Sequence, residues 1–178
     1  MARWFWYFLI YSFLGYCLEK LFAYATHSSR QVRKCFLLLP LCPVYGLAMT
    51  TFIALADPAF PFPILAVIGG TVCTAVEYLV HLYYDKVFSI QFWDYSDLSF
   101  HIGGRVCPHF ALVWGILSAA AVRYIHPGIE YLVSGISPAV TFGIWIVLAA
   151  DCVFTSALLL RCHDTEMLSI PALLTLYR

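Results

Sequence analysis

The chain has 178 residues, of which 62% are hydrophobic and 11% are charged, and its formal net charge is zero. Soluble domains carry about 25% charged residues, so this composition excludes an ordinary soluble protein and indicates a polytopic membrane protein. The zero net charge gives no reason to expect a nucleic-acid partner. We therefore expect an all-α protein whose first partner is the lipid bilayer.

About 20 apolar residues cross a bilayer as a helix. The stretches of this kind, in chain order, are Trp4–Ala25, Phe36–Ala56, Phe62–Tyr84, Val106–Tyr124 and Pro138–Leu160. They predict five transmembrane helices in a single transmembrane domain over residues 1–178, ending in a short tail at 161–178.

Basic residues are distributed unevenly between the two predicted sides of the membrane. One side would carry Arg30, Arg33, Lys34, Lys86, Arg105, Arg161 and Arg178, and the other side Arg3 and Arg123. Because cytoplasmic loops are enriched in Lys and Arg, we expect the N-terminus outside and the C-terminus in the cytoplasm.

The first four stretches contain an internal repeat. The paired sequences are YCLEKLFAY (16–24) with AVEYLVHLYY (75–84), and LLLPLCPVYGLAM (37–49) with IGGRVCPHFALVW (102–114). Both pairs keep a chemical feature, a late glutamate in the first and a Cys-Pro dipeptide in the second. We expect two parallel helix-loop-helix repeats, at about 4–57 and 62–125, followed by an additional helix at about 136–160.

Three carboxylates, those of Glu19, Glu77 and Asp151, lie inside predicted spans. A charge near mid-helix costs about 2.5–3.5 kcal/mol on the insertion scale, and such residues commonly mark ion or substrate sites. Each would lie about 10–15 Å below the cytoplasmic boundary at 1.5 Å per residue. We expect a cytoplasm-facing polar vestibule that binds an ion or small polar solute. The alternative is that the glutamates pair with Arg105 or Lys20 and only fix helix packing.

The stretch FWDYSDLSFHIGGRVCPHF (92–110) is unusually polar for this chain. Arg105 offers a planar cation suited to carboxylate or phosphate, and Asp94 with Tyr95 could form a lid over the vestibule. The backbone of the vestibule would come from the Gly-Gly pair and the two Cys-Pro turns, at Pro40, Cys42, Pro43, Gly103, Gly104 and Cys107. The alternatives are a tight glycine turn and an interfacial belt of aromatic residues.

No cofactor and no metal site are predicted. The sequence has no G-x-x-x-x-G-K-[ST] motif, and no Cys or His spacing matches a standard zinc site. The seven cysteines are odd in number and lack a C-x-x-C, which argues against a disulfide framework.

Several motifs in order, FLIYSFLGYCLE, PLCPVYG, WDYSD, GRVC and WG, resemble the bacterial CmpB-like family of type IV ABC-transporter permeases over about residues 8–127. The resemblance implies a small multi-span protein of the bacterial inner membrane with a transport role. The matched positions are Glu19, Pro40, Cys42, Pro43, Glu77, Trp93, Asp94, Tyr95, Gly104 and Arg105.

The chain departs from that family at two places. The family pattern has FLNGPLCP and FNINGR, whereas Leu38 and Leu39 replace the Asn-Gly here, and His101 and Gly103 replace asparagines. If those asparagines bind a ligand in the family, this member binds another ligand or none.

Three functions are compatible with these residues. The first is a small transporter or permease subunit, in which Glu19 and Glu77 bind a cation or proton and Arg105 orients an anionic group. At five helices it would need a second copy or another membrane subunit to enclose a path. The second is a membrane enzyme acting on a lipid or headgroup, with Asp94 or Glu77 as general base and Arg105 as phosphate clamp. The third is a non-catalytic membrane partner subunit.

Overall fold

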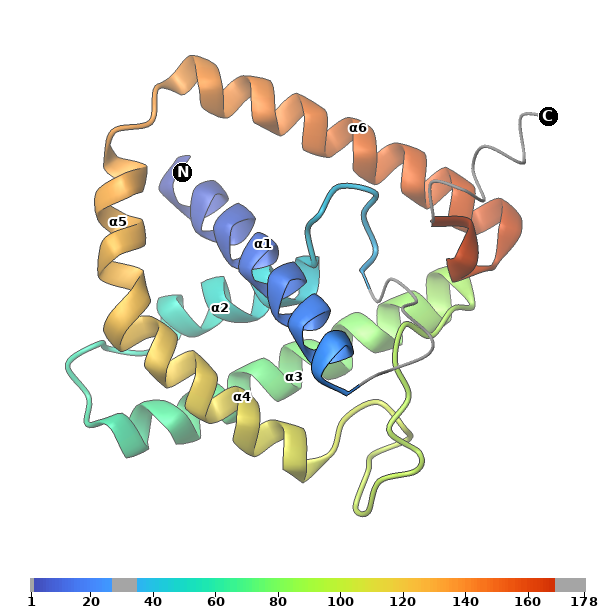
Figure 1. Ribbon diagram of the computed structural model, residues 1–178, viewed down its shortest axis with the longest axis horizontal. Coiled ribbons are helices and arrows are strands. Elements are labelled where there is room, and N and C mark those ends of the chain that lie inside the picture. Colours follow the sequence, from blue (N-terminus) through green and yellow to red (C-terminus); the bar gives the residue numbers. More distant parts are fainter. Residues whose placement is uncertain (1, 27–34, 169–178) are drawn as a thin grey trace.

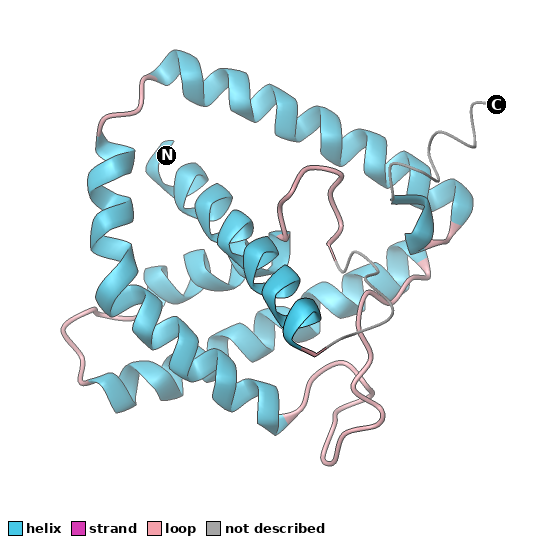
Figure 2. Ribbon diagram, viewed as in Figure 1, coloured by secondary structure: helices cyan, strands magenta, loops and turns pink. Residues whose placement is uncertain are grey.

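The computed structural model describes residues 2–26 and 35–168, and this part of the chain is built from helices (Figures 1 and 2). The main helices are α1 (Ala2–Ala25), α2 (Pro43–Leu55), α3 (Phe62–Phe88), α4 (Pro108–Ala120), α5 (His126–Ser134) and α6 (Pro138–Cys162). A π-helical turn at Ala121–Ile125 joins α4 to α5 without a break, and a short 3₁₀ helix, Thr165–Leu168, follows α6.

The all-α membrane fold is confirmed. Within the described residues, four helical segments are long and apolar enough to cross a membrane: Ala2–Ala25, Phe62–Phe88, Pro108–Ser134 and Pro138–Cys162. With α2 they make the five predicted helical segments. Of the basic residues used to orient the chain, Arg30, Arg33, Lys34 and Arg178 lie outside the described residues.

The predicted start of the second segment, Phe36, is wrong. Helix α2 begins at Pro43 and has 13 residues, which is about 20 Å at 1.5 Å per residue and less than the ~30 Å hydrocarbon core. Residues 35–42 form a bent, non-helical segment instead. The physical reason is the pair Pro40 and Pro43, because proline lacks a helical N–H and biases the residue before it away from helix.

The predicted end of the fourth segment, Tyr124, is also wrong, since the helix continues to Ser134. Pro127 lies in the first turn of α5 and directly follows the π-helical turn. Such a turn accommodates the proline ring and its missing N–H. The helix changes direction there, as the junction of α4 and α5 shows (Figure 1).

Buried side chains form two clusters at different ends of the helices. The larger cluster joins α1, α2, α3 and the α4–α5 segment through Tyr7, Tyr11, Met49, Phe52, Ala56, Leu65, Ala119, Val122, Ile129 and Val133. The smaller one contains Tyr84, Phe88, Ile90, Phe92, Leu159 and Leu168. The cavity described below lies beside the larger cluster and shares Tyr11 and Met49 with it.

The chain contains two helical hairpins, α1 with α2 and α3 with α4, and in each hairpin the two helices approach closely at a glycine. A Cβ atom at Gly46 would collide with Ser12, and one at Gly70 would lie 2.8 Å from the Ala111 carbonyl oxygen. The sequence offsets of the proposed repeat map Ser12 onto Gly70 and Gly46 onto Ala111. The two hairpins therefore pack at corresponding positions, as a duplicated hairpin would, although the duplication itself stays a prediction.

Helix α6 lies along one edge of the molecule (Figure 1) and is held near both ends. Near its start, Trp6 Nε1 donates to Thr141 Oγ1 at 2.9 Å. Just past its end, His163 Nδ1 bonds the Phe88 carbonyl at 2.7 Å. These contacts join α6 to α1 and α3.

The middle of α6 is fixed by Asp151. Its carboxylate accepts the backbone N–H of Leu38 at 3.2 Å and that of Leu39 at 2.9 Å, and also the Thr155 hydroxyl at 3.3 Å. The non-helical segment 35–42 thus obtains backbone hydrogen bonds from a side chain more than a hundred residues away. Buried backbone groups require such partners.

Replacing Gly46 with Leu should separate α1 from α2, because Ser12 and Phe8 fill the space that the new side chain needs. We expect a loss of about 1–3 kcal/mol in unfolding free energy, as for other overpacked interiors. Unfolding of the purified protein in detergent measures it. Gly143→Leu is the matched control, since a Cβ there meets nothing within 4 Å. Equal stability of the two variants would contradict this packing.

Candidate functional site

The polar stretch 92–107 folds into a compact cap over one end of α3. Trp93 Nε1 donates to the Arg105 carbonyl at 3.0 Å, and Tyr95 N–H donates to the Gly104 carbonyl at 2.8 Å. Gly103 and Gly104 have φ values of 57° and 72°, a backbone region that glycine adopts without strain. The glycine pair therefore makes the turn, and the WDYS and GR motifs face each other across it.

The side chains of Asp94 and Arg105 are bonded within the cap or to α3. Hydrogen bonds from Ser96 lower the pKa of the exposed Asp94 carboxyl. Arg105 forms an ion pair with Asp85 at 2.9 Å. The carbonyl of Trp93 accepts from His81 Nε2 at 3.1 Å. These bonds attach the cap to the end of α3.

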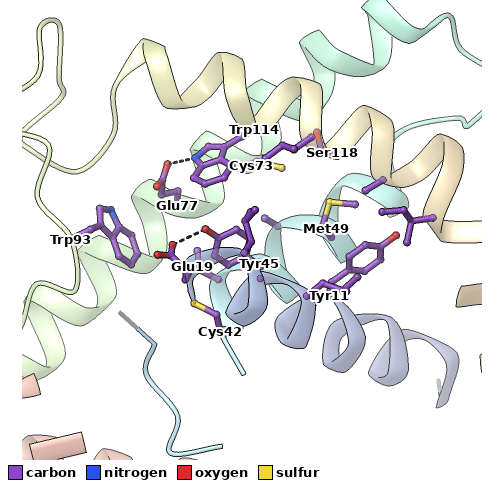
Figure 3. A pocket seen from close by; sticks show the side chains of 18 of the residues that line it. Tyr11, Glu19, Cys42, Tyr45, Met49, Cys73, Glu77, Trp93, Trp114 and Ser118 are labelled. Atoms are coloured by element: carbon purple, nitrogen blue, oxygen red, sulfur yellow. Dashed lines mark hydrogen bonds between the residues drawn. The ribbon is translucent and has the colours of Figure 1, made fainter. Parts of the chain in front are cut away.

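A cavity of about 260 Å³ lies between the two hairpins and the cap (Figure 3). Its lining is mostly apolar. The described residues that line it are Tyr11, Leu14, Gly15, Leu18, Glu19, Cys42, Val44, Tyr45, Ala48, Met49, Cys73, Glu77, Trp93, Tyr95, Trp114, Leu117, Ser118, Ala121 and Ile125. Two of these, Glu19 and Glu77, are carboxylates, and they come from different hairpins.

Glu77 on α3 is 7% exposed and accepts two hydrogen bonds from aromatic side chains. Tyr95 of the cap donates its hydroxyl to Oε1 at 2.9 Å, and Trp114 of α4 donates its indole N–H to Oε2 at 3.1 Å. Burial, followed by the charge of Glu77, raises the pKa of Tyr95, so this hydroxyl keeps its proton as a donor. Each carboxylate oxygen of Glu77 thus has a donor.

Glu19 on α1 has a corresponding partner in its own hairpin. The Tyr45 hydroxyl of α2 donates to Glu19 Oε1 at 2.7 Å. Figure 3 shows the Glu19–Tyr45 and Glu77–Trp114 bonds on the two sides of the cavity. The Tyr45 and Trp114 rings meet edge to face with centroids 5.6 Å apart. The donors of the two glutamates are therefore in contact with each other across the hairpin interface.

The structure brings some predicted site residues together and separates others. Glu19, Glu77, Tyr95 and Cys42 line the cavity. Asp151 instead binds the 35–42 segment, and Arg105 pairs with Asp85, so neither joins the two glutamates. The other predicted residues outside the lining are Asp94, Pro40, Pro43, Gly103, Gly104 and Cys107. Cys42 and Cys107 immediately precede α2 and α4, and Pro43 and Pro108 are their first residues.

Tyr45 and Trp114 are the site residues that sequence reasoning missed. Both stand inside the aligned repeat sequences, but neither is among the predicted site residues. Their chemistry gives a signal, because the O–H of a tyrosine or the N–H of a tryptophan within an apolar helix usually finds an acceptor. The acceptors are Glu19 for Tyr45 and Glu77 for Trp114, the two glutamates that the repeat aligns with each other.

Comparison with known families gives a match over most of the chain. The model of the family described as "Putative ABC-transporter type IV" (ABC_trans_CmpB) matches residues 6–156. The chain belongs to this family. The resemblance seen in its motifs is therefore confirmed, and this CmpB-family member is a multi-pass membrane protein related to ABC transporters. No curated protein and no solved structure gives a significant match.

Tyr95→Phe removes the hydroxyl that bonds Glu77 but keeps the ring, which stacks on Phe110 with centroids 4.8 Å apart. We expect a loss of about 1–2 kcal/mol in unfolding free energy, because a buried acceptor loses one of its donors. Tyr83→Phe is the control, since its side chain is 54% exposed. Thermal unfolding of both variants measures the difference, and identical melting temperatures would contradict a bond of this kind.

Proposed function

We propose that this CmpB-family protein is a permease-type subunit whose cavity between the two hairpins binds an ion or small solute at Glu19 and Glu77. One observation carries the proposal. Two intramembrane carboxylates, one from each hairpin, line the same cavity and are held by aromatic donors. Placing carboxylates in a membrane is costly, and they are usually retained for binding or transport.

The position of the cavity fits transport. Substrate sites in many transporters lie where two repeats meet, and movement of one unit against the other then opens the site to each side in turn. Here the Tyr45–Trp114 edge-to-face contact joins the two hairpins directly beside the glutamates. A relative movement of the hairpins would therefore change the cavity itself. We infer that a second copy or another membrane subunit completes the path.

The arrangement gives less support to a membrane enzyme. That hypothesis needs Arg105 as a phosphate clamp beside a general base, but Arg105 is paired with Asp85 and is not in the cavity lining. The partner-subunit hypothesis differs from the permease proposal in one respect, because it requires no ligand at the glutamates. The next experiment separates the two.

Neutralising the cavity should abolish ligand binding, at the cost of some stability, because a glutamine has one acceptor oxygen where Glu77 accepts at two. We expect at least one of Na⁺, K⁺, H⁺ or a panel of small solutes to raise the melting temperature of the purified wild type by mass action. Glu19→Gln and Glu77→Gln should lose that shift. Glu130→Gln, on α5 and outside the cavity lining, is the matched control and should retain it. If no ligand shifts the wild type, the partner-subunit hypothesis is favoured.

We further propose that the cap faces the cytoplasm of the bacterial cell and that the N-terminus lies outside. A cysteine at Ser99, exposed in the cap, should then react with an impermeant maleimide only after the inner membrane is opened. A cysteine at Ala59, exposed in the α2–α3 loop, should react in intact spheroplasts. Cys17→Ser removes an exposed native thiol from the background. If position 99 is labelled in intact spheroplasts and position 59 only after the membrane is opened, the orientation is the opposite of the one proposed.

A further inference from the structure

The charge of the cavity selects for a cation. Its described lining contains two carboxylates and no Lys, Arg or His. The nearby cations are engaged elsewhere, with Arg105 paired to Asp85 at 2.9 Å and Lys20 Nζ 5.8 Å from the centre of the Tyr16 ring. An anion would therefore meet two carboxyl groups and no basic side chain in the described lining.

The polar atoms of the cavity are poorly suited to a bare metal ion. Hard cations such as Ca²⁺ require about 6–8 oxygen ligands, and transition metals require several Cys, His or carboxylate groups. No cluster of three or more such side chains occurs in the part of the chain that the structure describes. Three of the four carboxylate oxygens of Glu19 and Glu77 already accept hydrogen bonds from Tyr45, Tyr95 and Trp114.

Aromatic rings supply the remaining attraction. Among the described residues, the rings in the lining are those of Tyr11, Tyr45, Trp93, Tyr95 and Trp114. A cation over such faces is attracted by the ring quadrupole, and sites that combine aromatic rings with carboxylates are suited to quaternary ammonium groups. An organic cation needs no oxygen ligands, so it fits a lining of this kind better than Na⁺ or Ca²⁺ does.

The rest of the lining adds an apolar requirement. Leu14 of α1, Leu117 of α4 and Ile125 of the π-helical turn are 38%, 41% and 48% exposed and also line the cavity. They belong to helical segments apolar enough to span the membrane, so this part of the cavity is bordered by side chains that would meet lipid. A ligand in contact with them carries hydrocarbon groups.

We propose that the cavity binds a compact lipophilic organic cation, with its charge between Glu19 and Glu77 and its hydrocarbon groups against the aromatic and leucine side chains. The volume of about 260 Å³ limits the ligand to a small one. This inference rests on the proposed function, because it uses the same cavity, and it adds the chemical class of the ligand.

The test compares three probes on the purified full-length protein: benzyltrimethylammonium, its neutral carbon isostere neopentylbenzene, and Na⁺. We expect benzyltrimethylammonium to bind the wild type at least tenfold more tightly than the isostere. The Glu19→Gln/Glu77→Gln double variant should lose this preference, while Glu130→Gln retains it. Equal binding of the charged and neutral probes would overturn the proposal, because the cavity would then be only an apolar pocket.

Two substitutions at Trp114 separate the contribution of its aromatic face to ligand binding from that of its hydrogen bond to Glu77. Trp114→Leu should weaken benzyltrimethylammonium binding about tenfold, as loss of a cation–π contact does, and Trp114→Phe should restore most of it. Trp145→Leu, on α6 and 55% exposed, is the control and should bind as wild type. If Trp114→Leu also binds as wild type, the aromatic part of the proposal is wrong.

The outcomes distinguish this inference from the proposed function. Binding of Na⁺ that depends on Glu19 and Glu77, without binding of benzyltrimethylammonium, would overturn the organic-cation inference and leave the permease proposal standing. Absence of binding for every probe and every solute of the earlier panel would overturn both.

Discussion

The structure depends on supplying hydrogen-bond donors to two carboxylates, Glu19 and Glu77, within an apolar helical bundle. Glu77 takes its donors from the cap and from α4, and Glu19 takes its donor from α2. Each bond therefore joins separate elements of one hairpin, and the contact between Tyr45 and Trp114 joins the hairpins to each other. The cost of placing these carboxylates in the bundle is offset by hydrogen bonds that also link α1 to α2 and α3 to α4 and the cap.

The polar stretch 92–107 follows from the same constraint. Its glycine turn and its ion pair with Asp85 place the Tyr95 hydroxyl on Glu77. The cap thus supports the Glu77 carboxylate, and its Arg105 contributes by pairing with Asp85 of α3. The polar residues of this stretch therefore have a structural role. They hydrogen-bond one another and α3, and they position the Tyr95 hydroxyl on Glu77.

Composition and apolar length predicted the all-α membrane fold and the order of the helices, because lipid permits few alternatives to a helix. The same signal misplaced the start of α2, where two prolines prevent helix in a stretch that is fully apolar. It also missed the passage through Pro127, since a π-helical turn has no apolar pattern of its own. The similar depth expected for Glu19 and Glu77 agrees with their lining one cavity, whereas Asp151, expected at the same depth, binds the 35–42 segment instead. The donors to the two glutamates were not predicted, because Tyr45 and Trp114 occupy different positions in the two aligned sequences and only tertiary packing brings them to the carboxylates.

The bonds from Asp151 to Leu38 and Leu39 have a consequence for biosynthesis. The segment at 35–42 leaves the ribosome more than a hundred residues before the carboxylate that accepts its N–H groups. These two hydrogen bonds cannot form until α6 has been synthesised, so the N–H groups of Leu38 and Leu39 gain the Asp151 carboxylate late. A chain that stops before α6 keeps the two prolines that prevent helix at 35–42 but lacks this acceptor.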